Sequence, residues 1–210
     1  MTIQADATPR EATATREATT PREATTPRED TTPRQDTTTR GGTRTGTRPV
    51  SGPAGHTARP VPPDVLDELR AVDDAGRPAV PLTDEEGGAP LRCCLRRSEA
   101  GESIALVSYA PLRRWAAAAG VDPGAYDEQG PVFIHARTCG GPAGGGLPFT
   151  GARRTLRRYS AAGRILGGRL VEDPDGFAEA FAEAFADPEV ALVHVRAVEY
   201  GCFLYEVRRG

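Results

Sequence analysis

The sequence of residues 130–139 is Gly130-Pro131-Val132-Phe133-Ile134-His135-Ala136-Arg137-Thr138-Cys139. Glycine and proline open an almost continuous apolar run, and polar residues followed by glycines close it. This pattern is typical of a strand that is buried on both faces. Because such strands lie where a core is thickest, we expect the rest of the domain to pack around this one. It ends at a histidine, and a cysteine follows four residues later, so the stretch also holds the first candidates for chemistry.

The segment before this strand is predicted to form a β-hairpin. Residues 91–97 alternate in character, which places Cys94 between Arg92 and Arg96 on the less apolar face of a strand. A turn follows, and residues 103–109 are predicted to return as the second strand.

Two more hairpins are predicted after the central strand. Residues 155–159 and 164–171 flank a three-residue connection that ends in Gly163, and residues 190–198 and 202–208 flank another that ends in Gly201. In the last hairpin we pair Val198 with Cys202, so that the numbers of any two paired residues sum to 400. This register places apolar pairs on one face. These pairs are Val193 with Val207, Val195 with Tyr205, and Ala197 with Phe203. The other face then pairs His194 with Glu206 and Arg196 with Leu204.

Helices are predicted at residues 63–70, 112–119 and 174–186. In the last of these, phenylalanines recur every four residues, which indicates a stripe that packs on a sheet. The pattern as a whole predicts an α+β fold: one domain, residues 59–210, of antiparallel β-hairpins packed against two or three helices.

Residues 1–58 have a different composition. Arginines recur every six residues from Arg10 to Arg40 in copies of Arg-Glu-Ala-Thr-Thr-Pro, with almost no large apolar side chains. Such a segment cannot offset the entropy lost on ordering, so it is predicted to be a disordered tail. His56, near its end, is expected to be solvated.

The composition gives no indication of a nucleic-acid or membrane partner. The formal net charge is -3, which gives no reason to expect nucleic acid or an anionic membrane as a partner. No run of about eighteen apolar residues occurs, and residues 1–6 lack the features of a secretory signal. We therefore expect a cytoplasmic protein whose four cysteines are free thiols.

Three readings of the cysteines and the strand histidine remain open. Cys94, flanked by arginines, could be a reactive thiolate with His135 as its base, which would make the protein a cysteine-dependent enzyme. Cys94, His135 and Cys139 could instead hold a metal, with zinc as the cofactor. Alternatively, they are ordinary buried side chains and no cofactor is bound. Cys93 is not expected to join its neighbour at one ion, because adjacent strand residues point to opposite faces.

The leading functional expectation is a domain that binds a small anionic molecule. Arginine side chains on the sheet, with one histidine and the Cys94 region, would converge in a pocket and grip a phosphate or carboxylate. The candidate ligand-binding residues are Arg92, Arg96, Arg157, Arg158, His194 and Arg196. A non-catalytic interaction module is the remaining alternative.

Several of these motifs, in this order, resemble a bacterial family known as domain of unknown function 1203 (DUF1203). The resemblance spans residues 62–209 and rests on Leu91-Arg92-Cys93-Cys94-Leu95, Gly101-Glu102, Gly130 to His135, Arg157-Arg158-Tyr159, Val193 to Arg196 and Gly201-Cys202-Phe203. Similar members often carry a cysteine at the position of Leu91, so the resemblance does not imply a two-cysteine site at that motif. It also implies no activity.

Overall fold

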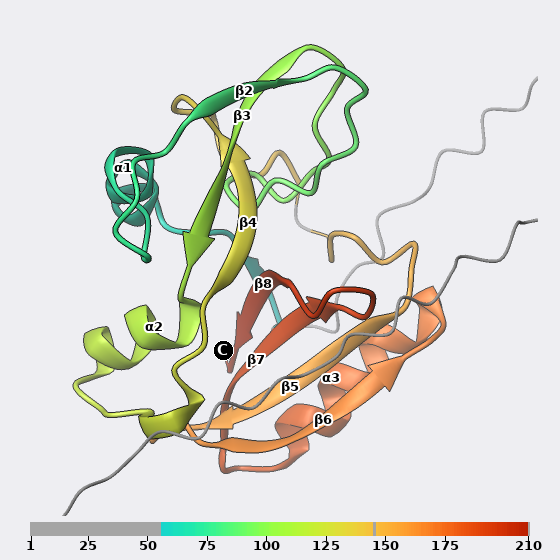
Figure 1. Ribbon diagram of the computed structural model, residues 1–210. Helices are drawn as coiled ribbons and strands as arrows, with labels where there is room; N and C mark the ends of the chain where they lie inside the picture. The colour runs from blue at the N-terminus through green and yellow to red at the C-terminus, as the bar shows by residue number, and fades with distance from the viewer. Residues whose placement is uncertain (1–55, 145, 210) are drawn as a thin grey trace, which may run out of the picture. The chain divides into compact units, whose positions relative to one another are not determined.

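Two antiparallel sheets and three α-helices make up the part of the chain that the computed structural model describes, which is residues 56–144 and 146–209 (Figure 1). All of these residues belong to one unit of the chain. The predicted α+β fold is confirmed. The tail predicted for residues 1–58 lies, up to residue 55, outside the described residues. No helix within the described ranges has both the length and the apolar character needed to cross a bilayer.

The smaller sheet has three strands in the order β2-β3-β4, at Pro81–Asp84, Glu102–Tyr109 and Gly130–His135. β4 is an edge strand. Val132 and Ile134 are buried, whereas Pro131 is exposed and Phe133 is only partly buried. The expectation that this strand is buried on both faces is therefore wrong. β3 is the central strand, and a proline is tolerated at the edge because no further strand needs its missing N–H.

The hairpin predicted for residues 91–97 and 103–109 is also wrong. β3 pairs with β2 and β4, and residues 92–96 form a tight turn. The Leu95 amide donates to the Leu91 carbonyl over 2.9 Å, and the Leu91 amide donates to the Arg96 carbonyl over 2.9 Å. Leu95 has a φ of 57°, which is unusual for a residue other than glycine. The alternating sequence pattern therefore does not lie in a strand.

The larger sheet has five strands in the order β1-β8-β7-β5-β6. They are β1 (Ala58–Arg59), β5 (Arg154–Ser160), β6 (Ile165–Val171), β7 (Val190–Ala197) and β8 (Phe203–Arg208). Both predicted hairpins are confirmed. The predicted register holds from Val193–Val207 to Val195–Tyr205, and a shift then pairs Arg196 with Phe203 instead of Leu204. This irregularity is a β-bulge, which sequence alternation alone does not reveal.

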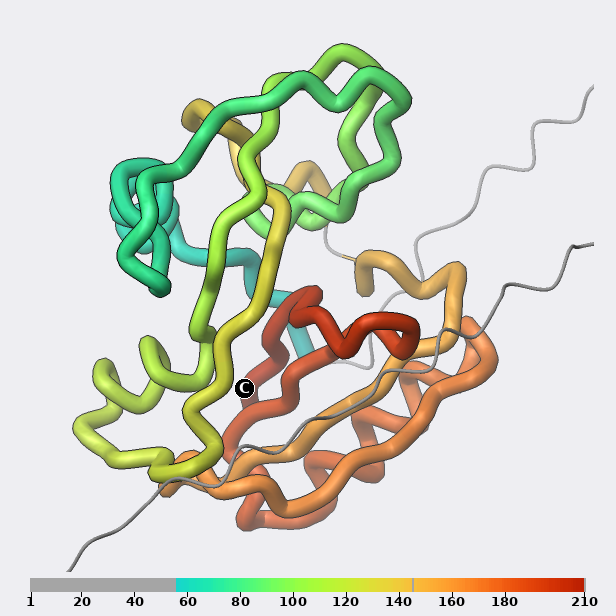
Figure 2. The backbone as a smooth tube through the Cα atoms, in the orientation of Figure 1, coloured from blue at the N-terminus to red at the C-terminus, as the bar shows by residue number. Residues whose placement is uncertain are grey.

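Each helix buries one face against a sheet or at its edge. The helices are α1 (Pro63–Ala71), α2 (Pro111–Ala119) and α3 (Phe177–Ala186). α3 follows a short 3₁₀ turn capped by the Asp173 carboxylate, which accepts from the Asp175 amide over 3.0 Å. Its three phenylalanines share one core cluster with apolar residues of β7 and β8, and the backbone trace shows this helix lying along the five-stranded sheet (Figure 2).

The first described residues already belong to the fold. Ala58 pairs with Val207 in β1, and the His56 ring lies 4.5 Å from the Phe185 ring of α3. His56 is partly buried, so the expectation that it is solvated is wrong.

The two sheets meet where β8 begins. The Arg92 guanidinium donates from Nε to the Phe203 carbonyl over 2.8 Å, and the Tyr109 and Phe203 rings lie edge to face at 5.5 Å. The turn at residues 92–96 is thus fixed to both sheets, which determines where its cysteines lie.

Candidate metal centre

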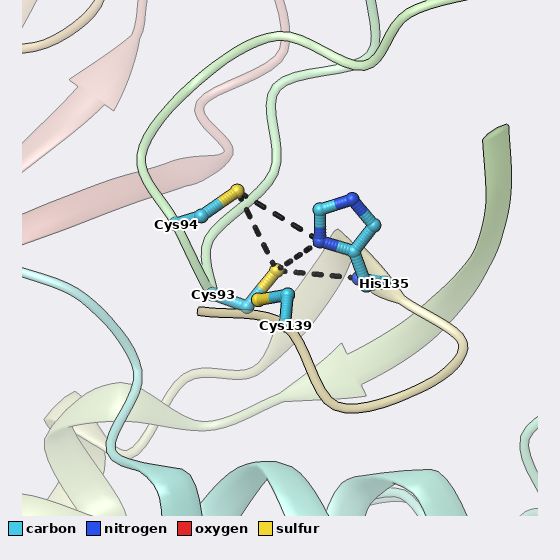
Figure 3. A group of neighbouring side chains, drawn as sticks. All are labelled: Cys93, Cys94, His135 and Cys139. Atoms are coloured by element: carbon cyan, nitrogen blue, oxygen red, sulfur yellow. Dashed lines mark hydrogen bonds between the residues drawn. The ribbon is translucent and has the colours of Figure 1, made fainter. Parts of the chain in front are cut away.

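Three cysteines and one histidine form a cluster at the end of the three-stranded sheet. The potential ligand atoms of Cys93, Cys94, His135 and Cys139 all lie within 4.8 Å of one another. His135 Nδ1 is 3.2 Å from Cys93 Sγ and 3.8 Å from Cys94 Sγ, and the two sulfur atoms are 3.9 Å apart. Figure 3 shows the three sulfur atoms and the imidazole gathered together from two segments that are far apart in sequence.

The turn explains why two adjacent cysteines can face the same point. In a strand, the side chains of Cys93 and Cys94 would point in opposite directions. Here the chain curls around them, with Leu95 in the left-handed conformation, and both sulfur atoms lie on the side of His135. The expectation that the side chains of Cys93 and Cys94 point in opposite directions is therefore wrong.

The other two ligands come from the end of β4 and the loop that follows. The Arg70 guanidinium of α1 fixes this segment, since Nε donates to the His135 carbonyl over 3.3 Å and Nη2 donates to the Arg137 carbonyl over 3.1 Å. The loop then turns back so that Cys139 Sγ reaches the other three groups.

The distances among Cys93, Cys94 and His135 are close to those required by a tetrahedral metal, and all four ligand atoms lie within 4.8 Å of one another. A zinc ion with Zn–S bonds of about 2.3 Å and a Zn–N bond of about 2.0 Å keeps its ligand atoms roughly 3.5–3.8 Å apart. The measured separations of 3.2, 3.8 and 3.9 Å lie close to this range. The cluster contains three sulfur atoms and one imidazole nitrogen, the ligand types that Zn²⁺ prefers in closed structural sites.

The second nitrogen of the imidazole also has a suitable partner. His135 Nε2 lies 3.5 Å from the Glu102 carboxylate, which Arg96 holds through both of its terminal nitrogens. Arg96 Nη2 itself is 3.3 Å from Nε2. If Nδ1 binds a metal, the ring proton lies on Nε2, where Glu102 can accept it. This is the usual arrangement of a metal-bound histidine.

The hydrogen bonds of the cluster separate the pKa values of the two adjacent thiols. A hydrogen bond from Cys93 Sγ, helped by the Arg96 amide and by the charges of His135 and Arg96, lowers the pKa of Cys94 to about 6 despite burial. The same hydrogen bond and burial raise the pKa of Cys93. In the metal-free cluster the thiolate form is therefore favoured at Cys94 over Cys93.

The arginines proposed from sequence do not converge on one pocket. Arg157 and Arg196 both bind the Glu128 carboxylate and line a cavity of about 300 Å³. The Arg158 guanidinium lies against Gly167 of β6. Arg96 is bound to Glu102 beside the cysteines, and Arg92 lines a different cavity. These residues therefore do not form the single anion pocket that we expected. The carboxylate of Glu128 also neutralises part of the positive charge of Arg157 and Arg196.

His194 is not on a charged surface. It pairs with Glu206 as predicted, at 3.5 Å, but the side chain is fully buried and its ring packs against Tyr159 and Phe203. Burial lowers the pKa of His194, although the neighbouring Glu206 acts in the opposite direction. An imidazole that is fully buried in the core is not available to bind an anion.

Three contributors to these sites were missed from the sequence. The sequence pattern predicts Cys93 on the opposite face of a strand from Cys94, and it does not predict Glu102 or Glu128 as site residues. The adjacent cysteines were the one signal that could have suggested a shared site, but only a turn brings both side chains to one side.

Comparison with known proteins gives one finding. A family model described as "Protein of unknown function (DUF1203)" matches residues 88–209, which include all four residues of the cluster. The match confirms the resemblance drawn from the sequence motifs. No curated protein and no solved structure matches the chain.

Proposed function

The chain belongs to the DUF1203 family, whose description names no activity, and we propose from the site itself that this member is a metal-binding domain. Cys93, Cys94, His135 and Cys139 hold one Zn²⁺ ion. The single observation that carries the proposal is that four soft or borderline ligand atoms from two segments lie within 4.8 Å of one another.

The site supports a structural role for the ion. All four positions of a tetrahedral ion are filled by protein atoms, so no position is left for water or substrate, as a catalytic zinc would need. Cys93 and Cys94 are buried, and the His135 side chain is only 12 % exposed. The ion would join the turn at residues 92–96 to the end of β4, in addition to the hydrogen bond from the Arg92 amide to the Phe133 carbonyl.

Metal analysis of the purified protein tests this proposal. The protein is prepared without chelators, dialysed against metal-free buffer and analysed by plasma mass spectrometry. We expect about one zinc per chain. Cys94→Ser should lose most of this metal, because three remaining ligands bind zinc far more weakly.

Cys202 provides the matched control. It is a free cysteine that is partly exposed and lies outside the cluster. Cys202→Ser should therefore retain one zinc per chain. Protein that is metal-free after growth in zinc-supplemented medium, and that takes up no zinc when titrated, would refute the proposal.

A second candidate function is cysteine-dependent catalysis. Cys94 Sγ lies 3.8 Å from His135 Nδ1, the contact that a thiol–imidazole pair requires. A cavity of about 290 Å³ is lined by Cys94, Arg96 and residues of the loop between β4 and β5. An electrophilic substrate in this cavity would be attacked by the Cys94 thiolate.

Alkylation kinetics distinguish the two candidates. A catalytic thiolate in the protein as purified reacts rapidly with iodoacetamide at pH 7, and mass spectrometry locates the label on Cys94. A zinc-bound thiolate is protected until the metal is removed. Labelling of Cys94 without chelator favours catalysis, and labelling only after chelation favours the metal centre.

A further inference from the structure

A cavity between the two sheets is distinct from the cysteine cluster. Its volume is about 600 Å³, which is within the range of about 300–1,000 Å³ usual for small-molecule sites. Apolar side chains from both sheets and from the loop before β5 form most of its wall. These include Leu106, Pro131, Phe133, Phe149 and Leu204.

Three arginines line this apolar cavity. Arg92 is 3 % exposed and Arg154 is 5 % exposed, while Arg97 lies at the surface. Among the described residues, none of the three forms an ion pair with a carboxylate within 4 Å. Glu199 is the acidic residue of the cavity wall, so the lining side chains carry an excess of positive charge.

Backbone carbonyls orient the two buried guanidiniums without neutralising them. Arg92 donates from Nε to Phe203 and from Nη1 to Pro90, and Arg154 donates from Nε to Phe149 over 3.0 Å and from Nη1 to Arg153 over 2.7 Å. Nη2 of each has no hydrogen-bond partner among the described residues. Both side chains thus keep a donor that can serve a ligand in the cavity they line.

Charges of the same sign in a buried site are costly without a counterion. Burial and the charge of Arg97 lower the pKa of Arg154, although the neighbouring Glu199 acts in the opposite direction. The carbonyl of Phe149 that holds Arg154 belongs to a residue with a φ of 56°. Such strained backbone is found preferentially at binding sites.

We propose that this cavity binds an organic carboxylate with an apolar hydrocarbon body. The carboxylate lies between Arg92 and Arg154, where a guanidinium can bind its two oxygens in parallel. The hydrocarbon part packs on Phe133, Phe149 and Leu204. None of the four residues of the cysteine cluster lines this cavity, although Arg92 directly precedes Cys93 in the chain.

Calorimetric titration of the full chain with octanoate tests the proposal. Octanamide has the same shape without the charge, and acetate has the charge without the chain. We expect octanoate to bind at least about tenfold more tightly than either analogue, because a hydrogen-bonded ion pair and apolar burial each contribute more than a factor of ten.

Matched variants locate the site. Arg154→Gln should weaken octanoate binding about tenfold or more, whereas Arg153→Gln, which changes the exposed neighbour, should not alter it. Arg97→Gln alters an exposed residue and so keeps the fold while weakening binding several-fold. Circular dichroism and thermal unfolding confirm that each variant is folded.

Two results would overturn the proposal. One is octanamide binding as tightly as octanoate, which would mean that the cavity recognises only the apolar chain. The other is unchanged octanoate affinity in folded Arg154→Gln or Arg97→Gln protein, or no binding to the wild-type protein.

Discussion

The carboxylate of Glu102 lies 3.5 Å from His135 Nε2, on the side of the imidazole opposite the three cysteine sulfur atoms. Its pKa is lowered to about 2 by Arg96 and by the Glu99 amide, so the carboxylate is ionised at neutral pH. A charged acceptor at this position keeps the ring proton on Nε2 and leaves Nδ1 free to bind a metal.

Glu102→Gln is therefore expected to weaken zinc binding about 10–100-fold while leaving one zinc per chain at saturation. Competition with a chromophoric chelator measures the affinity. Glu99→Gln, which changes an exposed carboxylate three residues before Glu102, is the control and should bind zinc like the wild type. Equal affinities for the two variants would show that Glu102 does not orient the histidine.

Asp73 connects the end of α1 to β3. Its carboxylate accepts hydrogen bonds from the amides of Ala75, Arg77 and Ser108, each 2.9 Å long, and it is 8 % exposed. Burial alone would raise the pKa of this carboxyl, but the three amides and the Arg77 guanidinium hold it below its usual value.

Because the folded-state pKa of Asp73 is lowered, its contribution to stability is present above the unfolded-state pKa of about 3.9 and is lost as the pH falls below that value. Asp73→Asn should reduce the free energy of unfolding by about 1–3 kcal/mol at pH 7 and by less at pH 3. Urea unfolding at both pH values measures this, with the exposed Glu85→Gln as control. A difference that grows toward acid pH would contradict the assignment.

Phe181 lies at the centre of the interface between α3 and the five-stranded sheet and is fully buried. Replacing it with alanine should lower the free energy of unfolding by about 3–5 kcal/mol, since the cavity cannot fully collapse. On the opposite face, Glu183 is exposed and pairs with Arg169, so Glu183→Ala should change stability by less than about 1 kcal/mol. Similar losses for the two variants in thermal unfolding would mean that α3 does not pack as described.

Zinc removal should loosen the turn more than the rest of the fold. A chelator is expected to lower the melting temperature by several degrees and to increase hydrogen exchange at residues 92–96 and 135–139. The amides of β7, at the centre of the larger sheet, should keep their protection. Uniform loss of protection in both sheets would instead show that the ion holds the whole domain together.

The sequence predicted those parts of the fold in which local pattern and tertiary packing agree. The last hairpin is an example, because its apolar alternation matches the observed pairs Val193–Val207 and Val195–Tyr205. The phenylalanine spacing of α3 likewise matches the buried face that contacts the sheet.

The turn at residues 92–96 could not be predicted in the same way. Its residues alternate between apolar and polar character as they would in a strand. The turn includes Leu95 in a backbone conformation that leucine rarely adopts. Because these residues lie in a turn and not in a strand, the sulfur atoms of Cys93 and Cys94 converge on His135. The pairing of Arg157 and Arg196 on Glu128 was missed for a different reason: residue 128 lies in an irregular segment whose position depends on both sheets.

X-ray absorption spectroscopy at the zinc edge of the purified protein tests the metal centre most directly. The structure predicts about three sulfur neighbours at about 2.3 Å and one nitrogen at about 2.0 Å, with one sulfur fewer in Cys93→Ser. A spectrum of oxygen and nitrogen neighbours only, or one that Cys93→Ser leaves unchanged, would contradict a centre built from these four residues.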